Sequence, residues 1–518
     1  MTPAADLRRE VAGTLLASFV GDELPAWVVR QAGAGLGGIC LYGSNAGADV
    51  ATVTSVLHDV RPDLVLALDE EGGDVTRLEA ATGSSVPGNA ALGAVDDVDL
   101  TRSVAAALGG MLCSVGIDLD LAPCADVNSA PSNPVIGVRS FGADPALVAR
   151  HTAAFVSGLQ SVGVSATAKH FPGHGAVAVD SHVSLPTVTA PLAVLHDREL
   201  APFRAAISAG VAGVMPGHLL VPALDPAAPA TVSRRIVTDL LRDELGFGGV
   251  VVTDALDMGG IGGPGAIPGN VVRALAAGAD LCCLGPGNDE ALVEECIDVV
   301  VAAVAAGELA AERVAEAAGR TRALARPRQP GPDGAAPSPD PPHAPPPRVL
   351  ARVGEAAAAR AVRADGPVPP RIVGAHVVEL DRPANIAAGP VPWGVATALA
   401  ELDPTTTATR IADGADRMVD TALAAARHRP LVVVVRDPAR FPAQAAALGA
   451  LLAARPDAVV VDMGWPSDPP GVVGTGAAHI TTHGASRASG RAVARLLAGL
   501  PVPVPAPSPP TSGRIARG

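Results

Sequence analysis

Residues 245–258 read LGFGGVVVTDALDM, and the apolar run inside this stretch decides the fold that we expect. Gly249–Thr253 is short and nearly continuous in hydrophobicity, which is typical of a parallel strand buried on both faces. Asp254 follows the run directly, where a barrel strand delivers a side chain into the mouth of the barrel. A carboxylate there can be a nucleophile, a metal ligand or the partner of a buried arginine. Asp257 lies three residues further on, so Asp254 is the stronger candidate of the two.

The same pattern continues in both directions, from about residue 5 to residue 325. Short apolar runs alternate with alanine-rich segments of helical spacing, such as Ala143–Gln160 and Leu192–Ala209. About seven or eight such units predict a TIM-like (β/α)8 barrel over residues 1–325, and a doubly wound open sheet is the alternative. The other strand candidates are Gly38–Leu41, Leu64–Leu68, Ile117–Leu121, Ser165–Ala168, Gly213–Met215 and Asp280–Leu284.

The rest of the 518-residue chain divides into three parts, as expected for a length that exceeds one core. Residues 326–347 are rich in proline and have no apolar periodicity, which predicts a linker. Residues 348–500 are expected to form a smaller α/β sandwich-like domain, with strands near Ile372–Leu380, Leu431–Val435 and Ala458–Val461. Residues 501–518 are again rich in proline and are expected to be a disordered tail.

Composition and charge narrow the classes of function. A net charge of −14 argues against nucleic acid as a partner, because that contact needs basic patches. No apolar stretch approaches the ~18 residues of a membrane span, and the first twenty residues carry no signal-peptide pattern. The six cysteines lie mostly inside apolar runs without metal-site spacing, which is typical of buried thiols in a reducing compartment. We therefore expect a cytoplasmic protein with a small-molecule partner, and the sequence does not decide its oligomeric state.

Polar residues gather just after the strand candidates, on the side where the loops of such a barrel form the active face. One of these clusters contains the only lysine among 38 basic residues, Lys169, which points to a function that arginine cannot replace. The clusters are DEEGGDVTR (69–77), NPVIGVRSF (133–141), KHFPGHGAVAVDSH (169–182), MPGH (215–218) and TDALDM (253–258).

The end of the Lys169 cluster suggests a group for proton transfer. Asp180 lies two residues before His182 in a loop, so its carboxylate can accept the imidazole N–H, fix the tautomer and raise the basicity of the ring. A surface turn with an incidental hydrogen bond is the alternative. A zinc site that uses His170, His174 and His182 is disfavoured, because the spacing is not helical and Pro172 lies inside it. We expect no metal and no cofactor.

These strings together resemble glycoside hydrolase family 3, and most of all its β-N-acetylglucosaminidase branch. The resemblance covers about residues 10–325 and rests on DEEGGDVTR, KHFPGHG followed by DSH, LGFGGVVVTDALDM and AGAD (277–280). Residues 348–500 resemble the second α/β domain of the family more weakly, through LVVVVRDPARFPAQ (431–444) and THGASRASGRAVARLLAG (482–499).

The resemblance implies a retaining exo-β-N-acetylglucosaminidase that hydrolyses terminal β-linked N-acetylhexosamine, with peptidoglycan fragments as the expected substrates. By the same resemblance Asp254 is the nucleophile, His182 the proton donor and Asp180 the residue that orients it. The second domain is expected to have a structural role. The residues implied to hold the sugar are Asp69, Arg77, Arg139, Lys169 and His170, whose charged groups are strong hydrogen-bonding partners for hydroxyls.

Some positions depart from the family pattern and leave the substrate preference open. The family usually has Gln or His at Glu70, Arg at Asp74, and small or hydroxyl residues at Pro216-Gly217. It has Asp-Thr where this chain has Ala176-Val177. The sequence therefore leaves two alternatives to the hydrolase open. One is a β-N-acetylglucosaminide phosphorylase with the same residues, since a neutral imidazole does not repel phosphate, and the other is a non-catalytic sugar-binding protein.

Overall fold

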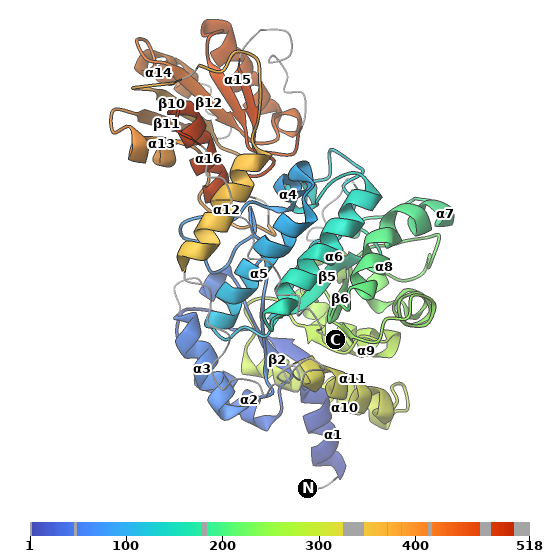
Figure 1. The fold of residues 1–518 in the computed structure, drawn as a ribbon. Helices are drawn as coiled ribbons and strands as arrows, with labels where there is room; N and C mark the ends of the chain where they lie inside the picture. The colour runs from blue at the N-terminus through green and yellow to red at the C-terminus, as the bar shows by residue number, and fades with distance from the viewer. Residues whose placement is uncertain are drawn as a thin grey trace, which may run out of the picture.

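The computed structural model describes residues 3–45, 49–177, 184–324, 347–369, 371–384, 386–412, 417–466 and 478–501. These residues form two α/β domains, each built around a sheet of its own (Figure 1). The chain enters the second domain through α12 (Pro347–Ala361).

The first sheet is a barrel in which every pairing is parallel. Its hydrogen-bonded order is β7-β6-β5-β4-β3-β2-β1-β8. An isolated parallel bridge between Val252 and Leu281 joins β7 to β8, so the two ends of this order meet. The predicted TIM-like fold is confirmed, and the open-sheet alternative is wrong. The strands are β1 (Leu15–Ala17), β2 (Gly38–Leu41), β3 (Val65–Leu68), β4 (Leu119–Asp120), β5 (Ser165–Phe171), β6 (Gly213–Pro216), β7 (Val250–Val251) and β8 (Cys282–Cys283).

All seven strand candidates of the barrel are confirmed, and β1 was not expected. Its three residues follow helix α1 (Pro3–Ala12) so closely that their apolar side chains continue the helical pattern of the N-terminus. Only the pairing of β1 with both β2 and β8 identifies it as a strand.

Helices surround the barrel and bury their apolar faces against it (Figure 1). Helix α6 shows how the sequence sets such a helix: Asp144 accepts hydrogen bonds from the backbone N–H groups of Ala146 and Leu147, and Pro145 occupies the first turn. The long helices of the barrel domain, α6 included, are α2 (Ala26–Ala34), α3 (Val50–Val60), α5 (Val98–Ser114), α6 (Pro145–Ser161), α8 (Leu200–Ser208), α9 (Ile267–Ala277), α10 (Glu290–Ala305) and α11 (Ala311–Leu324).

The second sheet has the order β11-β10-β12-β13-β14-β9, and only β9 runs antiparallel to its neighbour. The three predicted strands correspond to β10 (His376–Leu380), β12 (Leu431–Val435) and β13 (Val459–Asp462). The other three are β9 (Arg363–Asp365), β11 (Thr407–Ile411) and β14 (His479–Thr481). Strand β9 is fully exposed and β11 mostly exposed, so neither has the continuous apolar run that reveals a buried strand.

Helix α12 packs against both domains and lies beside α5 in Figure 1. Its Leu350 and Ala357 belong to the apolar core of the barrel, whereas Ala358 packs against Ala488 and Ala492 of helix α16 (Arg487–Leu497). At Gly354 a Cβ atom would lie 2.0 Å from the carbonyl oxygen of Ser85, so this close approach requires glycine. In the part of the chain that the structure describes, no helix is long and apolar enough to cross a membrane.

Candidate active site

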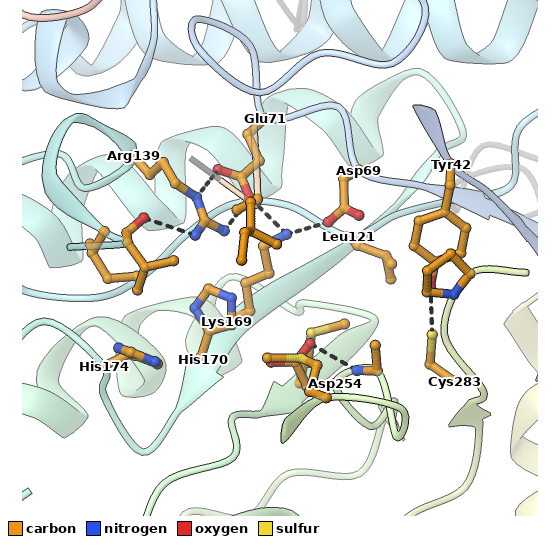
Figure 2. Close-up of a pocket in the computed structure, with 18 of the residues that line it drawn as sticks. Tyr42, Asp69, Glu71, Leu121, Arg139, Lys169, His170, His174, Asp254 and Cys283 are labelled. Atoms are coloured by element: carbon orange, nitrogen blue, oxygen red, sulfur yellow. Dashed lines mark hydrogen bonds and ion pairs between the residues drawn. The ribbon is translucent and has the colours of Figure 1, made fainter. Parts of the chain in front are cut away.

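A cavity of about 230 Å³ opens at the carboxyl ends of the barrel strands. All five predicted sugar-holding residues and Asp254 line it, although they are up to 185 positions apart in the chain. Parallel strands bring them together, because every strand of a barrel ends at the same rim. Figure 2 shows the labelled side chains facing one another across this space. The remaining lining includes Tyr42, Glu71, Leu121, Val135, Ile136, His174, Met215, Met258, Cys283, Ile386 and Ala387.

Lys169 and Arg139 are joined through Glu71, which lies between them (Figure 2). The Glu71 carboxylate accepts hydrogen bonds from Nε and Nη2 of Arg139 at 2.9 and 2.7 Å, and it lies 2.8 Å from Lys169 Nζ. Lys169 Nζ also donates to Asp69 Oδ1 at 2.5 Å. The four charged groups therefore form one continuous chain along a wall of the cavity.

This network keeps its charges although it is buried. Burial by itself favours the neutral carboxyl form, but Arg139 and Lys169 outweigh it and hold the pKa of Glu71 well below its usual range. Burial likewise opposes the charge of Lys169, and Asp69 and Glu71 outweigh it, so the pKa of this ammonium is raised. The wall thus presents fixed charges that can bind sugar hydroxyls.

Arg77 connects the cavity to the second domain. Its Nη2 lies 3.9 Å from Asp69 and donates a hydrogen bond to the carbonyl oxygen of Ala387 at 2.7 Å. Ile386 and Ala387 both line the cavity, and they come from the loop between β10 and α13 (Ala396–Leu402). The second domain therefore supplies part of the wall, which goes beyond the structural role that the sequence suggested.

His170 is held by a buried carboxylate. Asp126 follows β4, and its Oδ2 lies 2.7 Å from Nδ1 of His170, while its Oδ1 accepts the backbone N–H of His174 at 2.6 Å. Burial and the neighbouring His170 lower the pKa of His174 to about 4, so that ring is neutral at neutral pH. Asp126 thereby fixes the orientation of His170 in the cavity.

Among the described residues, one group of side chains could hold a metal ion. Ligand atoms of Cys124, Asp126 and His170 lie within 4.8 Å of one another, and all three residues are buried. Burial and the neighbouring Asp126 raise the pKa of Cys124 well above its usual range, so the thiol keeps its proton and donates toward Asp126 at 3.2 Å. Hydrogen bonds within the protein account for these three groups without a metal.

Asp254 reaches the cavity from the end of β7, opposite the charged wall (Figure 2). The residue is half-buried, and its Oδ1 accepts the backbone N–H of Ala255 at 2.9 Å. Asp257 also lines the cavity, but its carboxylate packs against Gly285, where a Cβ atom would lie only 2.0 Å away. Asp257 is thus held against the backbone, while Asp254 faces the predicted sugar-holding residues.

Asp180 and His182 lie outside the described residues, and their roles stay predictions. The described chain stops at Val177, which is buried, and begins again after residue 183. Of the positions that depart from the family pattern, Ala176 and Val177 are thus the last described residues before the segment that carries Asp180 and His182.

The other departures have partners in the structure. Glu70 is fully buried and does not line the cavity, and one of its oxygens accepts the backbone N–H groups of Arg77 and Leu78. Burial raises the pKa of Glu70 to about 7. Asp74, where the family usually has Arg, forms an ion pair with Arg436 of the second domain. Pro216 lies in β6, and the next residue, Gly217, approaches the Cβ atom of His170.

Sequence reasoning missed Glu71, Asp126, Ile386 and Ala387. Glu71 stands inside the quoted DEEGGDVTR string, and Asp126 follows the strand candidate Ile117–Leu121, so the position after a strand was the available signal. Ile386 and Ala387 had no such signal, because only the docking of the second domain brings them to the barrel.

Comparison with known proteins agrees with this geometry. Residues 28–324 match the model of the glycosyl hydrolase family 3 N-terminal domain. A beta-hexosaminidase from Nitrosomonas eutropha is 35% identical over 298 residues, which are 55% of this chain and 83% of that protein. Beta-hexosaminidase A from Pseudoalteromonas piscicida is 40% identical over 250 residues, which are 44% of this chain and 42% of that protein.

Solved structures extend the similarity to both domains. A glycoside hydrolase family 3 beta-N-acetylglucosaminidase from Paenibacillus sp. FPU-7 superposes with a TM-score of 0.81 and 31% identity, covering 96% of this chain and 98% of that chain. A beta-glucoside phosphorylase shares only 16% identity at a TM-score of 0.70, a likeness of fold alone. The chain therefore belongs to glycosyl hydrolase family 3 and is a glycoside hydrolase.

Proposed function

We propose that the chain is a retaining exo-β-N-acetylglucosaminidase that removes terminal β-linked N-acetylhexosamine. One observation carries this proposal: Asp254 and the ion-paired wall of Asp69, Glu71, Lys169 and Arg139 line a single cavity. The wall offers charged groups for the hydroxyls of one sugar, and Asp254 offers a carboxylate for its anomeric carbon. The Paenibacillus relative, which this chain matches along nearly its whole length, is a beta-N-acetylglucosaminidase.

In this proposal Asp254 attacks the anomeric carbon while His182 protonates the departing oxygen. The bond to the aglycone breaks, and a covalent glycosyl-enzyme forms on Asp254. His182, now neutral, takes a proton from water, and the resulting attack releases the sugar with retained configuration. Asp180 accepts the other imidazole N–H and so keeps the ring in the tautomer that this cycle needs.

The apolar side of the cavity suits the acetamido group of the substrate. Val135, Ile136, Met215 and Met258 line the cavity together with the charged wall. A methyl group that packs on such side chains is removed from contact with water. This burial contributes about 0.8 kcal/mol per carbon to the free energy of binding. A plain hexose lacks this methyl group, so the apolar lining supports selection of an N-acetylhexosamine.

We also propose that the natural substrates are peptidoglycan fragments and that the enzyme acts in the cytoplasm. All six cysteines are free thiols, and all but Cys113 are buried. Unpaired cysteines are typical of a reducing compartment. The fragments would be small glycosides with a terminal β-linked N-acetylglucosamine, which the single cavity at the rim of the barrel can accept from its non-reducing end.

The test uses an activated aryl N-acetylglucosaminide and compares Asp254→Asn with Asp257→Asn. We expect Asp254→Asn to abolish turnover, because no glycosyl-enzyme can form, while Asp257→Asn keeps most of it. Normal turnover of Asp254→Asn would move the nucleophile elsewhere. The product formed in phosphate buffer is analysed as well: free sugar supports the hydrolase, and sugar 1-phosphate would instead identify a phosphorylase.

A further inference from the structure

A second cavity, of about 330 Å³, lies between the two domains, and we call it the interdomain cavity. Three arginines and a tryptophan of the second domain line it, namely Arg382, Arg410, Arg436 and Trp393. The acidic side chains in its lining are Asp381 and Asp74, and Asp74 comes from the barrel. The lining thus contains three guanidinium groups and two carboxylates, and Glu379, which does not line the cavity, pairs with Arg410 at 2.6 Å.

The topology of the second sheet places this cavity at a site where α/β domains commonly bind ligands. After β10 the chain adds β11 on one side, and it then returns to add β12 and β13 on the other side. The strand order therefore reverses between β10 and β12, and ligands of open α/β sheets bind outside the carboxyl ends of strands at such a point. Arg382 follows β10 by two residues, and Arg436 follows β12 directly.

Arg382 lacks full compensation of its charge. Its side chain is 9% exposed, its Nε has no hydrogen-bond partner, and its nearest carboxylate oxygen, on Asp437, lies 3.5 Å from Nη2. Burial, and then the neighbouring Arg436, lower the pKa of Arg382 to about 10. The Nε of Arg436 also lacks a partner, while its Nη2 binds Asp74. Asp74 in turn accepts the backbone N–H of Ala485 at 2.8 Å, and its negative charge offsets that of Arg382 only in part.

We propose that the interdomain cavity binds the oxyanion of a small ligand, a phosphate or a carboxylate, between Arg382 and Arg436. A guanidinium presents N–H donors in a planar fork that matches such groups, and the pair forms shorter and stronger hydrogen bonds than neutral groups do. Trp393 is already covered by Arg410 and Arg436, whose guanidinium carbons lie 5.0 and 4.9 Å from its ring centroid. Its indole therefore orients the arginines.

The same loop lines both cavities. Arg382 and Trp393 lie near its ends and face the interdomain cavity, whereas Ile386 and Ala387 lie near its middle and face the active-site cavity. An anion held by Arg382 would therefore order the loop whose middle forms the wall beside Arg77. The anion can be a separate small molecule or an acidic substituent of the glycoside, and both sources share this chemistry.

Calorimetric titration of the full chain with inorganic phosphate, and separately with acetate, tests the proposal at constant ionic strength. We expect single-site binding of at least one of these anions, and about tenfold weaker binding in Arg382→Gln, because one charge-assisted hydrogen-bonding group is lost. Arg440→Gln is the matched control: Arg440 contacts the same Asp437 and the same Phe441 ring as Arg382, but it does not line the cavity. Binding in this variant should be unchanged.

Arg382→Lys covers the case in which Arg382→Gln fails to fold, because it keeps the charge and removes only the planar fork. We expect it to bind the anion severalfold more weakly than the wild type. The proposal is overturned if neither phosphate nor acetate binds to the wild type. It is also overturned if the wild type and all variants bind the anion with equal affinity. Because calorimetry measures anion binding without turnover, its result does not depend on whether the proposed glycosidase activity is correct.

A kinetic comparison distinguishes the two sources of the anion. If the anion belongs to the substrate, Arg382→Gln raises KM for an aryl glycoside that carries a carboxylate and leaves KM for its neutral analogue unchanged. If the anion is a separate ligand, added phosphate or acetate changes KM for the neutral glycoside in the wild type and not in Arg382→Gln.

Discussion

Glu71 binds Arg139 through two hydrogen bonds and Lys169 through an ion pair, so one buried carboxylate sets the position of both cations. Glu71→Gln would leave two buried positive charges with less compensation. Breaking a buried pair in this way typically costs about 3–5 kcal/mol. We expect lower stability and a raised KM, measured by chemical unfolding and by steady-state kinetics. Glu79→Gln, on the same loop but outside the cavity, should leave KM unchanged; an equal rise in both variants would contradict the role of Glu71.

The ion pair of Asp74 and Arg436 should stabilise the contact between the domains. Both side chains are nearly buried, with 7% and 11% exposure, so solvent screens the pair little. Asp74→Asn removes the charge and keeps an acceptor for the N–H of Ala485. A double-mutant cycle with Arg436→Gln should give a coupling free energy of about 1–3 kcal/mol in thermal unfolding. Additive effects of the two substitutions would mean that the pair contributes nothing to docking.

Glu70 should make the protein less stable as the pH rises. Burial raises its pKa from 4.5 to about 7. Between these values the unfolded chain releases the proton while the folded chain keeps it, so stability falls through this range, by about 3 kcal/mol at pH 8. Glu70→Gln keeps an acceptor for Arg77 and Leu78 and should therefore be more stable than the wild type at pH 8, with little difference at pH 4.

Unfolding by urea at a series of pH values measures this effect. Asp120 and Asp462, whose pKa values burial also raises, still titrate in the variant, so its pH dependence should weaken without vanishing. A variant that loses stability at pH 8 would show that Glu70 is charged in the folded protein.

His182→Ala should affect poor leaving groups far more than good ones. A proton donor matters most when the departing oxygen is basic, and general acid catalysis contributes about 10²–10⁴-fold. We expect a loss of this size on a natural disaccharide and a much smaller loss of glycosylation with a dinitrophenyl aglycone. Azide needs no base to attack, so it should restore the breakdown of the glycosyl-enzyme. Asp180→Asn should show the same pattern more mildly. Equal losses on both substrates without azide rescue would assign the proton donor to another group.

Prolonged treatment with a chelator should leave the activity unchanged. The thiol of Cys124 stays protonated beside Asp126, and Asp126 already accepts hydrogen bonds from His170 and His174. Activity that falls on chelation and returns with zinc would instead support a metal on the histidines of the Lys169 cluster.

The order of amino acids predicts the barrel because its strands are buried on both faces. Seven apolar runs such as Gly249–Thr253 stand out for this reason, and the polar residues after them, from Asp69 to Asp254, meet in one cavity. Two strands could not be predicted in this way. The apolar residues of β1 continue the pattern of the preceding helix, and β9 is fully exposed. Hydrophobic periodicity reports burial, so it cannot reveal a strand that burial does not mark.

Which residues close the active-site cavity was decided only by the tertiary structure. Asp69, Lys169 and Asp254 could be predicted from their own strands, since parallel strands always end at a shared rim. Ile386 and Ala387 lie about 300 residues after Arg77 in the sequence, and they reach it only because the second domain docks on the barrel. That docking depends on contacts between side chains distant in sequence, such as Asp74 with Arg436, and no local pattern in the chain encodes such a pairing.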